Sequence, residues 1–379
     1  MTLRLPRDAA TLVLFAKEFL AAEAKDIDAV TANDAARAQI RSACRHVAGL
    51  AYPDSGTMTV EMENARGALH QVLAAIYERE FSLVPLAQTQ SDAQPVLRDM
   101  VSILEDAMLA NELKAIAETQ VTGYPTDGVG YVRWLKRLIS RHPAAWHPFY
   151  QQHMRRRATV ADVKFWLAQE TNLDPRFDDI LALLQIGASG TAKMEISRNY
   201  DDEMGNGKPE EVHTTLFQKA LDALSVSAEY IAQTVLPEAR VSGNVSAAMA
   251  VSRRHHYRAI GYFGVTEYFA PARFKHVLKA WERLGLPDDG AVYHRLHVTI
   301  DTVHGNAWLN NVIAPAIEQD PALGREIAIG ALIRLNSSGR YLDQMLAFLQ
   351  SRPQADGQPA AQRPVAPASK PPEPQREPG

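Results

Sequence analysis

The chain contains a single cysteine, Cys44, among its 379 residues. An internal disulfide is therefore impossible, and so is a zinc or iron–sulfur site built from several thiolates. A signal-peptide pattern is also missing, because the short apolar stretch 11–16 is interrupted at once by Lys17 and Glu18. We therefore expect a protein of the reducing cytoplasm.

Long hydrophobic runs and a large excess of one charge are absent as well. No segment reaches the roughly 18 consecutive apolar residues that a transmembrane helix needs. The net charge is only -4, whereas nucleic-acid-binding proteins are usually strongly basic. We expect neither a membrane nor a nucleic acid as a partner.

Alternating patterns of β-branched residues, which mark strands, are scarce too. Ala, Leu, Glu, Arg and Gln dominate instead, so we expect an all-α fold. The length suggests more than one domain, and we divide the chain into a helical accessory domain over residues 1–155 and a second helical domain over residues 156–351. The segment 352–379 holds eight prolines and almost no large aliphatic residue, and we expect it to be disordered.

Two helix boundaries can be predicted from local signals. Thr159 and Asp162 have the spacing of a capping box, which predicts a helix that begins at residue 160. Pro271 cannot donate a backbone hydrogen bond, so we expect it to separate a helix over 247–269 from a helix over 271–284.

The strongest chemical signal is the motif His297-x-x-x-Asp301-x-x-His304. In an α-helix these positions lie on one face, so two imidazoles and a carboxylate project together. Such nitrogen and oxygen ligands suit iron, manganese or zinc, and the lack of thiolates favours the first two. The alternative is a polar face in solvent, but apolar neighbours such as Leu296 and Val298 argue for a buried helix.

A second group joins Glu203, at the expected end of one helix, to His213, near the start of the next. The glycine-containing segment 205–207 between them would let both side chains point to the same place. The alternative is an acidic capping region with a surface histidine. That simpler interpretation fits the neighbouring acids Asp201, Asp202, Glu210 and Glu211.

Glu267 stands alone in a strongly apolar, aromatic segment, 261–269. Buried glutamates are rare unless they are paired or bind a metal, which makes this residue a further candidate ligand. The alternative is a surface glutamate on an amphipathic helix. Three carboxylates and three imidazoles from separate helices would match the way diiron sites are built in helical proteins.

These motifs resemble those of the haem-oxygenase-like diiron oxidases, in particular the branch that contains the N-oxygenase of streptozotocin biosynthesis. The resemblance covers residues 159–350 and implies the helical bundle of haem oxygenase, preceded here by the accessory domain. It implies two iron ions, Fe(II) or Fe(III), with six ligands: Glu203, His213, Glu267, His297, Asp301 and His304. For a seventh carboxylate ligand, Glu170 is our candidate, with Asp178 and Asp179 as rivals.

The resemblance also implies an oxygenase with O2 as co-substrate and a small amino-acid-derived metabolite as substrate. N-oxygenation in natural-product biosynthesis is the reaction that we expect, with oxidative C–C or C–N cleavage or rearrangement as the alternative. An external electron donor and a homodimer are further expectations. If the substrate carries a carboxylate, an arginine should lie near the iron; the candidates are Arg254, Arg258, Arg295 and Arg334, and Tyr262, Tyr293 and His294 are candidates for the pocket wall.

Other protein classes fit the sequence less well. A haem enzyme would not need so many ligands, and a thiaminase-like enzyme would need a reactive cysteine, for which Cys44 is poorly placed. A ferritin-like protein would carry two Glu-x-x-His motifs, but only Glu210 and His213 have this spacing. The non-enzymatic alternative is a helical scaffold protein, which would bind no iron.

Overall fold

The computed structural model describes residues 3–54 and 57–352, with the side chains of residues 301 and 302 outside the description. Helices make up nearly all of this part and it contains no strand, which confirms the all-α prediction. None of its helices combines the length and the apolar character needed to cross a membrane. Residues 353–379 are outside the described part, so the expected disorder of the proline-rich tail stays a prediction.

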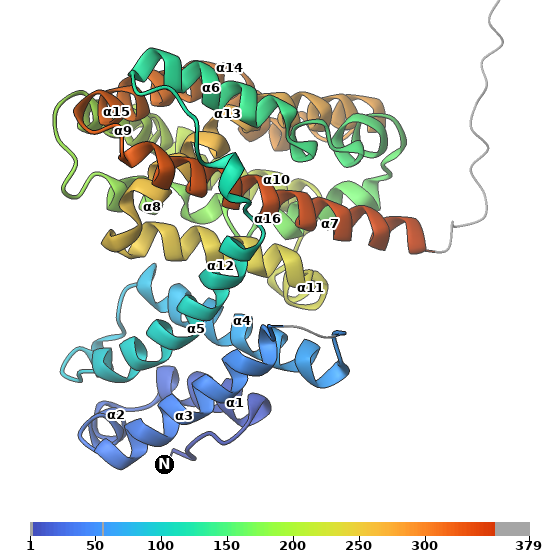
Figure 1. The fold of residues 1–379 in the computed structure, drawn as a ribbon. Coiled ribbons are helices and arrows are strands. Elements are labelled where there is room, and N and C mark those ends of the chain that lie inside the picture. The colour runs from blue at the N-terminus through green and yellow to red at the C-terminus, as the bar shows by residue number, and fades with distance from the viewer. Residues whose placement is uncertain (1–2, 55–56, 353–379) are drawn as a thin grey trace, which may run out of the picture.

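The N-terminal helices form a layer at one end of the molecule (Figure 1). They are α1 (Ala9–Ala21), α2 (Ala24–Thr31), α3 (Asp34–Ala51), α4 (Val60–Glu80) and α5 (Gln94–Lys114). Asp8, Asn33 and Thr59 each accept a hydrogen bond from a backbone N–H in the first turn of a helix, and so fix where α1, α3 and α4 begin.

The remaining helices form the larger part of the molecule (Figure 1). They are α6 (Gly128–Arg141), α7 (Val160–Glu170), α8 (Phe177–Leu184), α9 (Gly190–Glu203), α10 (His213–Ala223), α11 (Ala228–Thr234), α12 (Pro237–Val251), α13 (His256–Leu284), α14 (Val292–Trp308), α15 (Ala314–Gln319) and α16 (Leu323–Ser351). Short 3-10 turns connect them: η1 (Leu86–Gln88), η2 (Glu118–Gln120), η3 (Pro143–Trp146), η5 (Asp174–Arg176), η6 (Gly205–Gly207), η7 (Pro209–Glu211), η8 (Arg253–His255) and η9 (Asp288–Ala291). Two segments are π-helical: η4 (Phe149–Arg157) and η10 (Leu309–Ile313).

The start of α7 has the predicted capping box. The side chain of Thr159 accepts a hydrogen bond from the backbone N–H of Asp162 at 3.2 Å, and the Asp162 carboxylate accepts one from the N–H of Thr159 at 3.0 Å. Two of the N–H groups that a helix start leaves unpaired are satisfied in this way.

The prediction that Pro271 separates two helices is wrong. Helix α13 continues through Pro271, and the interruption lies instead at Ser252, whose backbone is extended, inside the range 247–269 expected to be one helix. Pro271 removes only one donor from the helix, and packing against α14 and α16 along α13 compensates for that loss. Tertiary contacts therefore override the local signal.

Glycines allow α13 and α16 to approach until their backbones touch. A Cβ atom on Gly261 would collide with the carbonyl of Ile327, and one on Gly330 would collide with the carbonyl of Arg258. Any larger residue at these positions would push the helices apart. The close approach brings side chains from the later turns of both helices to the same cavity.

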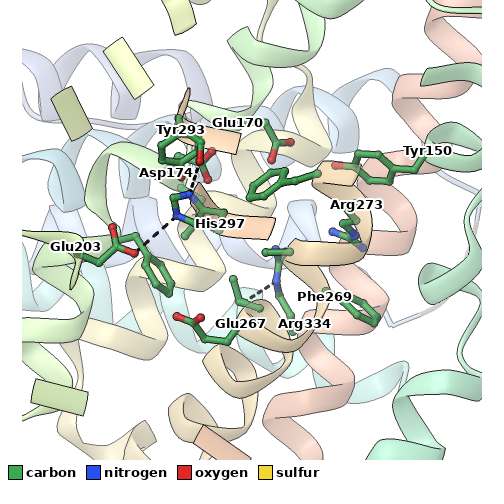
Figure 2. Close-up of a pocket in the computed structure, with 15 residues that line it drawn as sticks. Tyr150, Glu170, Asp174, Glu203, Glu267, Phe269, Arg273, Tyr293, His297 and Arg334 are labelled. Atoms are coloured by element: carbon green, nitrogen blue, oxygen red, sulfur yellow. Dashed lines mark hydrogen bonds and ion pairs between the residues drawn. The ribbon is translucent and has the colours of Figure 1, made fainter. Parts of the chain in front are cut away.

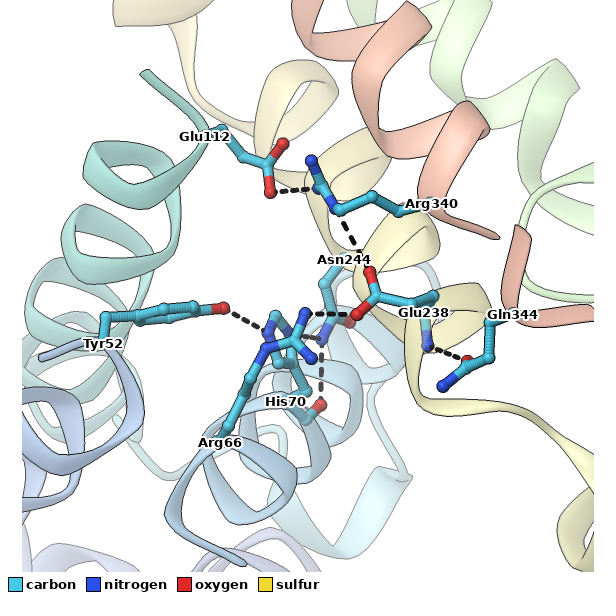
Figure 3. A network of polar contacts seen from close by, with 8 residues as sticks. All are labelled: Tyr52, Arg66, His70, Glu112, Glu238, Asn244, Arg340 and Gln344. Carbon is cyan, nitrogen blue, oxygen red and sulfur yellow. Dashed lines mark hydrogen bonds and ion pairs between the residues drawn. The ribbon is translucent and has the colours of Figure 1, made fainter. Parts of the chain in front are cut away.

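Partly buried ion pairs join the N-terminal layer to α12 and α16 (Figure 3). Arg66 of α4 donates to Glu238 of α12 at 2.6 Å, and Arg340 of α16 lies 2.5 Å from Glu112 of α5. Arg340 also reaches Glu238 at 3.4 Å, so one network links four helices. Replacing Arg340 would leave the buried carboxylate of Glu112 without its partner, which makes this part of the network costly to disrupt.

His70 lies at the centre of the same contact region (Figure 3). The Tyr52 hydroxyl is 2.6 Å from its Nε2 atom, and the Asn244 amide donates to the backbone carbonyl of His70 at 2.9 Å. Burial lowers the pKa of His70 to about 3, so the ring is neutral at physiological pH.

The division into domains 1–155 and 156–351 stays a prediction. Helix α6, from the first range, packs against α15, from the second.

Candidate metal centre

Three side chains from three different helices converge on one point. Glu203 ends α9, His213 begins α10 and His297 lies in α14, and one ligand atom from each lies within 4.8 Å of the other two. The Nδ1 atom of His213 is 2.8 Å from Glu203 Oε2. The Nε2 atom of His297 is 3.8 Å from Glu203 Oε1, a contact drawn in Figure 2. All three residues are buried. The structure thus brings together three of the residues predicted from the sequence.

The loop between Glu203 and His213 makes this convergence possible. Gly205 and Gly207 have φ angles of 65° and 81°, and Asn206 has a φ of 52°, so three consecutive residues adopt the left-handed conformation. A side chain at Gly205 would also meet the backbone of Glu211. The predicted role of the segment 205–207 in turning the chain back fits this geometry.

The carboxylate of Glu203 is ionised between the two imidazoles. Burial alone would raise the pKa of Glu203, but the imidazoles of His213 and His297 outweigh it and hold the pKa at about 2. The Nδ1 atom of His297 donates to the backbone carbonyl of Tyr293 at 2.8 Å, and this contact turns its Nε2 atom toward Glu203. Histidines that bind metals commonly make this second hydrogen bond.

Glu267 and His304 lie near the same carboxylate. Glu267 is 3% exposed, its Oε1 atom has no hydrogen-bond partner among the described residues, and burial, together with the charge of Glu203, raises its pKa well above the ordinary value. The Nε2 atom of His304 is 2.7 Å from Asp202, and burial lowers its pKa. Its Nδ1 atom has no partner in the described part of the chain. Buried polar atoms without partners are rare in native proteins, and a bound metal ion would satisfy them.

The two remaining predicted ligands are Asp301 and Glu170. The side chain of Asp301 lies outside the described residues, so its assignment stays a prediction. Glu170 does not join the converging three residues; it lines the adjacent cavity and accepts a hydrogen bond from Tyr341 at 2.6 Å. Neither of its rivals, Asp178 and Asp179, lines that cavity.

The cavity beside Glu203 and His297 contains residues that the sequence analysis missed (Figure 2). Asp174 was not among the predicted ligands, yet it lines this cavity, and burial and the charges of Glu170 and Glu203 raise its pKa. Arg273 and Tyr150 also line the cavity. Asp202, interpreted as a surface cap, contacts His304. No local pattern marked these residues, since the packing of distant helices places them here.

Some of the residues predicted to contact the substrate line the cavity, and others lie away from it. Arg334 and Tyr293 line the cavity, and Tyr262 packs under Arg334. The other three arginines are held in ion pairs away from it: Arg254 with Glu105 and Asp106, Arg258 with Glu326, and Arg295 with Asp288.

His294 is buried behind the cavity wall, against the rings of Trp166, Phe274 and Trp281. Burial lowers the pKa of His294 to about 3. Cys44 is buried in α3, and burial raises the pKa of its thiol to about 12, so it is no nucleophile. The positions of these two residues therefore support neither a substrate contact by His294 nor a reactive Cys44.

Comparison with known proteins adds an independent observation. Residues 164–339 match the family of iron-containing redox enzymes. This segment includes every predicted ligand, from Glu170 to His304. The match supports the haem-oxygenase-like superfamily, an iron-dependent redox enzyme and iron as the metal, and it speaks against a helical scaffold protein. No curated protein matches the chain.

Proposed function

We propose that the protein is a non-haem diiron oxygenase that activates O2 to oxidise a small amino-acid-derived metabolite. The observation that carries this proposal is the convergence of Glu203, His213 and His297, with the partnerless atoms of Glu267 and His304 beside them. Nitrogen and carboxylate ligands without thiolates suit iron, and helical proteins hold iron pairs with carboxylates and histidines on facing helices.

In this proposal Glu203, His213, Glu267, His297, Asp301 and His304 would together hold the two irons. The charge of Glu203 affects the pKa of both Glu267 and His304, which fits a single group of ligands around the metal site. When bound, the irons would supply electrons and open coordination positions for O2. Glu170 stays our candidate for a seventh ligand.

The protein's own residues line the cavity in which the substrate would react. The cavity next to Glu203 and His297 is walled in part by aromatic residues such as Phe177 and Phe274, which would limit the access of water. Arg273 and Arg334, which also line this cavity, can orient a polar substrate. We propose N-oxygenation as the reaction, with oxidative C–C or C–N cleavage or rearrangement as the alternative, and an external electron donor and a homodimer as further parts of the proposal.

The test is mass spectrometry after aerobic incubation of the iron-loaded protein with a reductant and a panel of amino-acid derivatives. N-oxygenation predicts a product that retains every carbon and gains one oxygen atom from isotope-labelled O2. Cleavage predicts a product that has lost a carbon or nitrogen fragment. If no panel member consumes O2 above the level of a His297→Ala variant, the oxygenase proposal is wrong.

A further inference from the structure

Two arginines face the candidate metal ligands across the cavity. Arg273 of α13 and Arg334 of α16 line it together with Glu203 and His297 (Figure 2). The cavity volume is about 50 Å³, which is room for a group the size of a carboxylate or for a few water molecules. The α13–α16 contact places both guanidinium groups at the same end of this space.

Neutral groups hold both arginines in position. Arg334 is buried, donates to the Thr266 hydroxyl at 2.9 Å and lies 5.6 Å from the centre of the Tyr262 ring. Arg273 donates to the Ser338 hydroxyl at 2.8 Å and lies 4.7 Å from the centre of the Phe269 ring. These contacts fix the planes of the guanidinium groups without neutralising their charges.

Neither arginine has a carboxylate within 4.0 Å among the described residues, unlike Arg66 and Arg340 in the N-terminal contact region. Two acids of the cavity interact with these charges at longer range, Glu170 with both arginines and Asp174 with Arg334. Glu170 makes its short contact with Tyr341. Burial, and to a smaller extent the charge of Arg334, lowers the pKa of Arg273. A pair of enclosed cations without a counter-ion is costly, so an anion that enters the cavity gains from both.

We infer that Arg273 and Arg334 bind the carboxylate of the substrate and thereby hold its reacting end toward Glu203 and His297. This inference rests on the proposed function, because it takes the ligand of the cavity to be the substrate. The planar guanidinium fork matches a carboxylate with two parallel hydrogen bonds, and the fixed orientation of both forks makes them a preformed anion site. Arg273 and Arg334 are thus specificity-determining residues for a substrate that carries a carboxylate.

Calorimetric titration of the full-length, Fe(II)-loaded protein under anaerobic conditions tests this inference. The probes are acetate and acetamide, which have similar shape but differ in charge. We expect acetate to bind, acetamide to bind at least tenfold more weakly, and Arg273→Met and Arg334→Met each to weaken acetate binding at least tenfold. Arg325→Met is the matched control, because Arg325 is exposed and paired with Glu118, and it should bind acetate like the wild type.

Two further measurements keep the test decisive. Arg273→Lys retains the charge but not the fork, so it should bind acetate with intermediate strength, and the thermal midpoint of each variant shows whether it is folded. Acetate binding of unchanged strength in both Met variants, or no acetate binding to the wild type, overturns the inference. Iron content is measured in the same samples: a wild type without iron whose acetate binding still depends on both arginines would contradict the diiron proposal but not the anion site.

Discussion

Replacement of Glu267 by glutamine should stabilise the metal-free protein while it damages the metal site. The carboxyl group is buried, its Oε1 atom has no partner among the described residues, and its pKa is raised well above 4.5. Because the pKa of Glu267 is higher in the folded than in the unfolded protein, the protonated carboxyl group contributes fully to stability below pH 4.5. This contribution is lost as the pH rises toward the pKa of the folded state. Glutamine has nearly the same shape and cannot ionise, so the variant escapes that loss.

The size of the effect follows from this linkage. At pH 5.5, one unit above the ordinary pKa, the unfolded wild type gains about 1.4 kcal/mol from ionisation that the folded form does not gain. We expect metal-free Glu267→Gln to be more stable than the wild type by about that amount at pH 5.5 and by little at pH 4. Urea unfolding at both pH values measures it.

The same variant loses a candidate ligand. Its iron content after reconstitution should fall from about two ions per chain to about one or fewer, and the stabilisation that iron gives, about 2.7 kcal/mol at a hundredfold excess over the dissociation constant, should shrink. Glu229→Gln, at an exposed site in the first turn of α11, is the matched control and should change neither quantity. A Glu267→Gln protein that is destabilised at pH 5.5, or that retains full iron, would refute this reasoning.

Two further predictions concern the fold. The pKa of His70 is about 3 in the folded protein and 6.5 in the unfolded chain, so its contribution to stability is complete above pH 6.5 and is lost as pH falls toward 3. Between pH 7.5 and 5.5 the free energy of unfolding should therefore fall by about 1.4 kcal/mol less in His70→Gln than in the wild type. Equal pH dependences of the two proteins would contradict this. Gly330→Ala forces a methyl group against the Arg258 carbonyl and should cost about 3 kcal/mol in urea unfolding, whereas Gly49→Ala, with open space around it in α3, should be neutral or slightly stabilising. Equal effects of the two glycine substitutions would refute the packing argument.

Local signals in the sequence predicted local structure well. The all-α class is confirmed, and the capping box of Thr159 and Asp162 forms at the start of α7. The same kind of reasoning was wrong at Pro271, because a proline signal reports only the chain's own backbone, whereas packing against two neighbouring helices decides whether α13 continues.

The candidate site shows the same limit. Glu203 and His213 could be connected because a glycine loop separates them by only a few residues, and the spacing on α14 marked His297. Asp174 and Arg273 could not be found, because nothing near them in sequence shows that their helices meet at the cavity. Their positions follow from the glycine-mediated approach of α13 to α16 and from the packing of the surrounding helices.

Metal analysis of the full-length protein, reconstituted with Fe(II) without oxygen and freed of excess metal, tests the central claim most directly. The account predicts about two irons per chain, with both lost or nearly lost in His297→Ala. His142→Ala is the control, since His142 contacts Asn336 at 3.1 Å and does not line the cavity, and it should retain both ions. A wild type that binds no iron, or a His297→Ala variant that keeps both ions, would contradict the account.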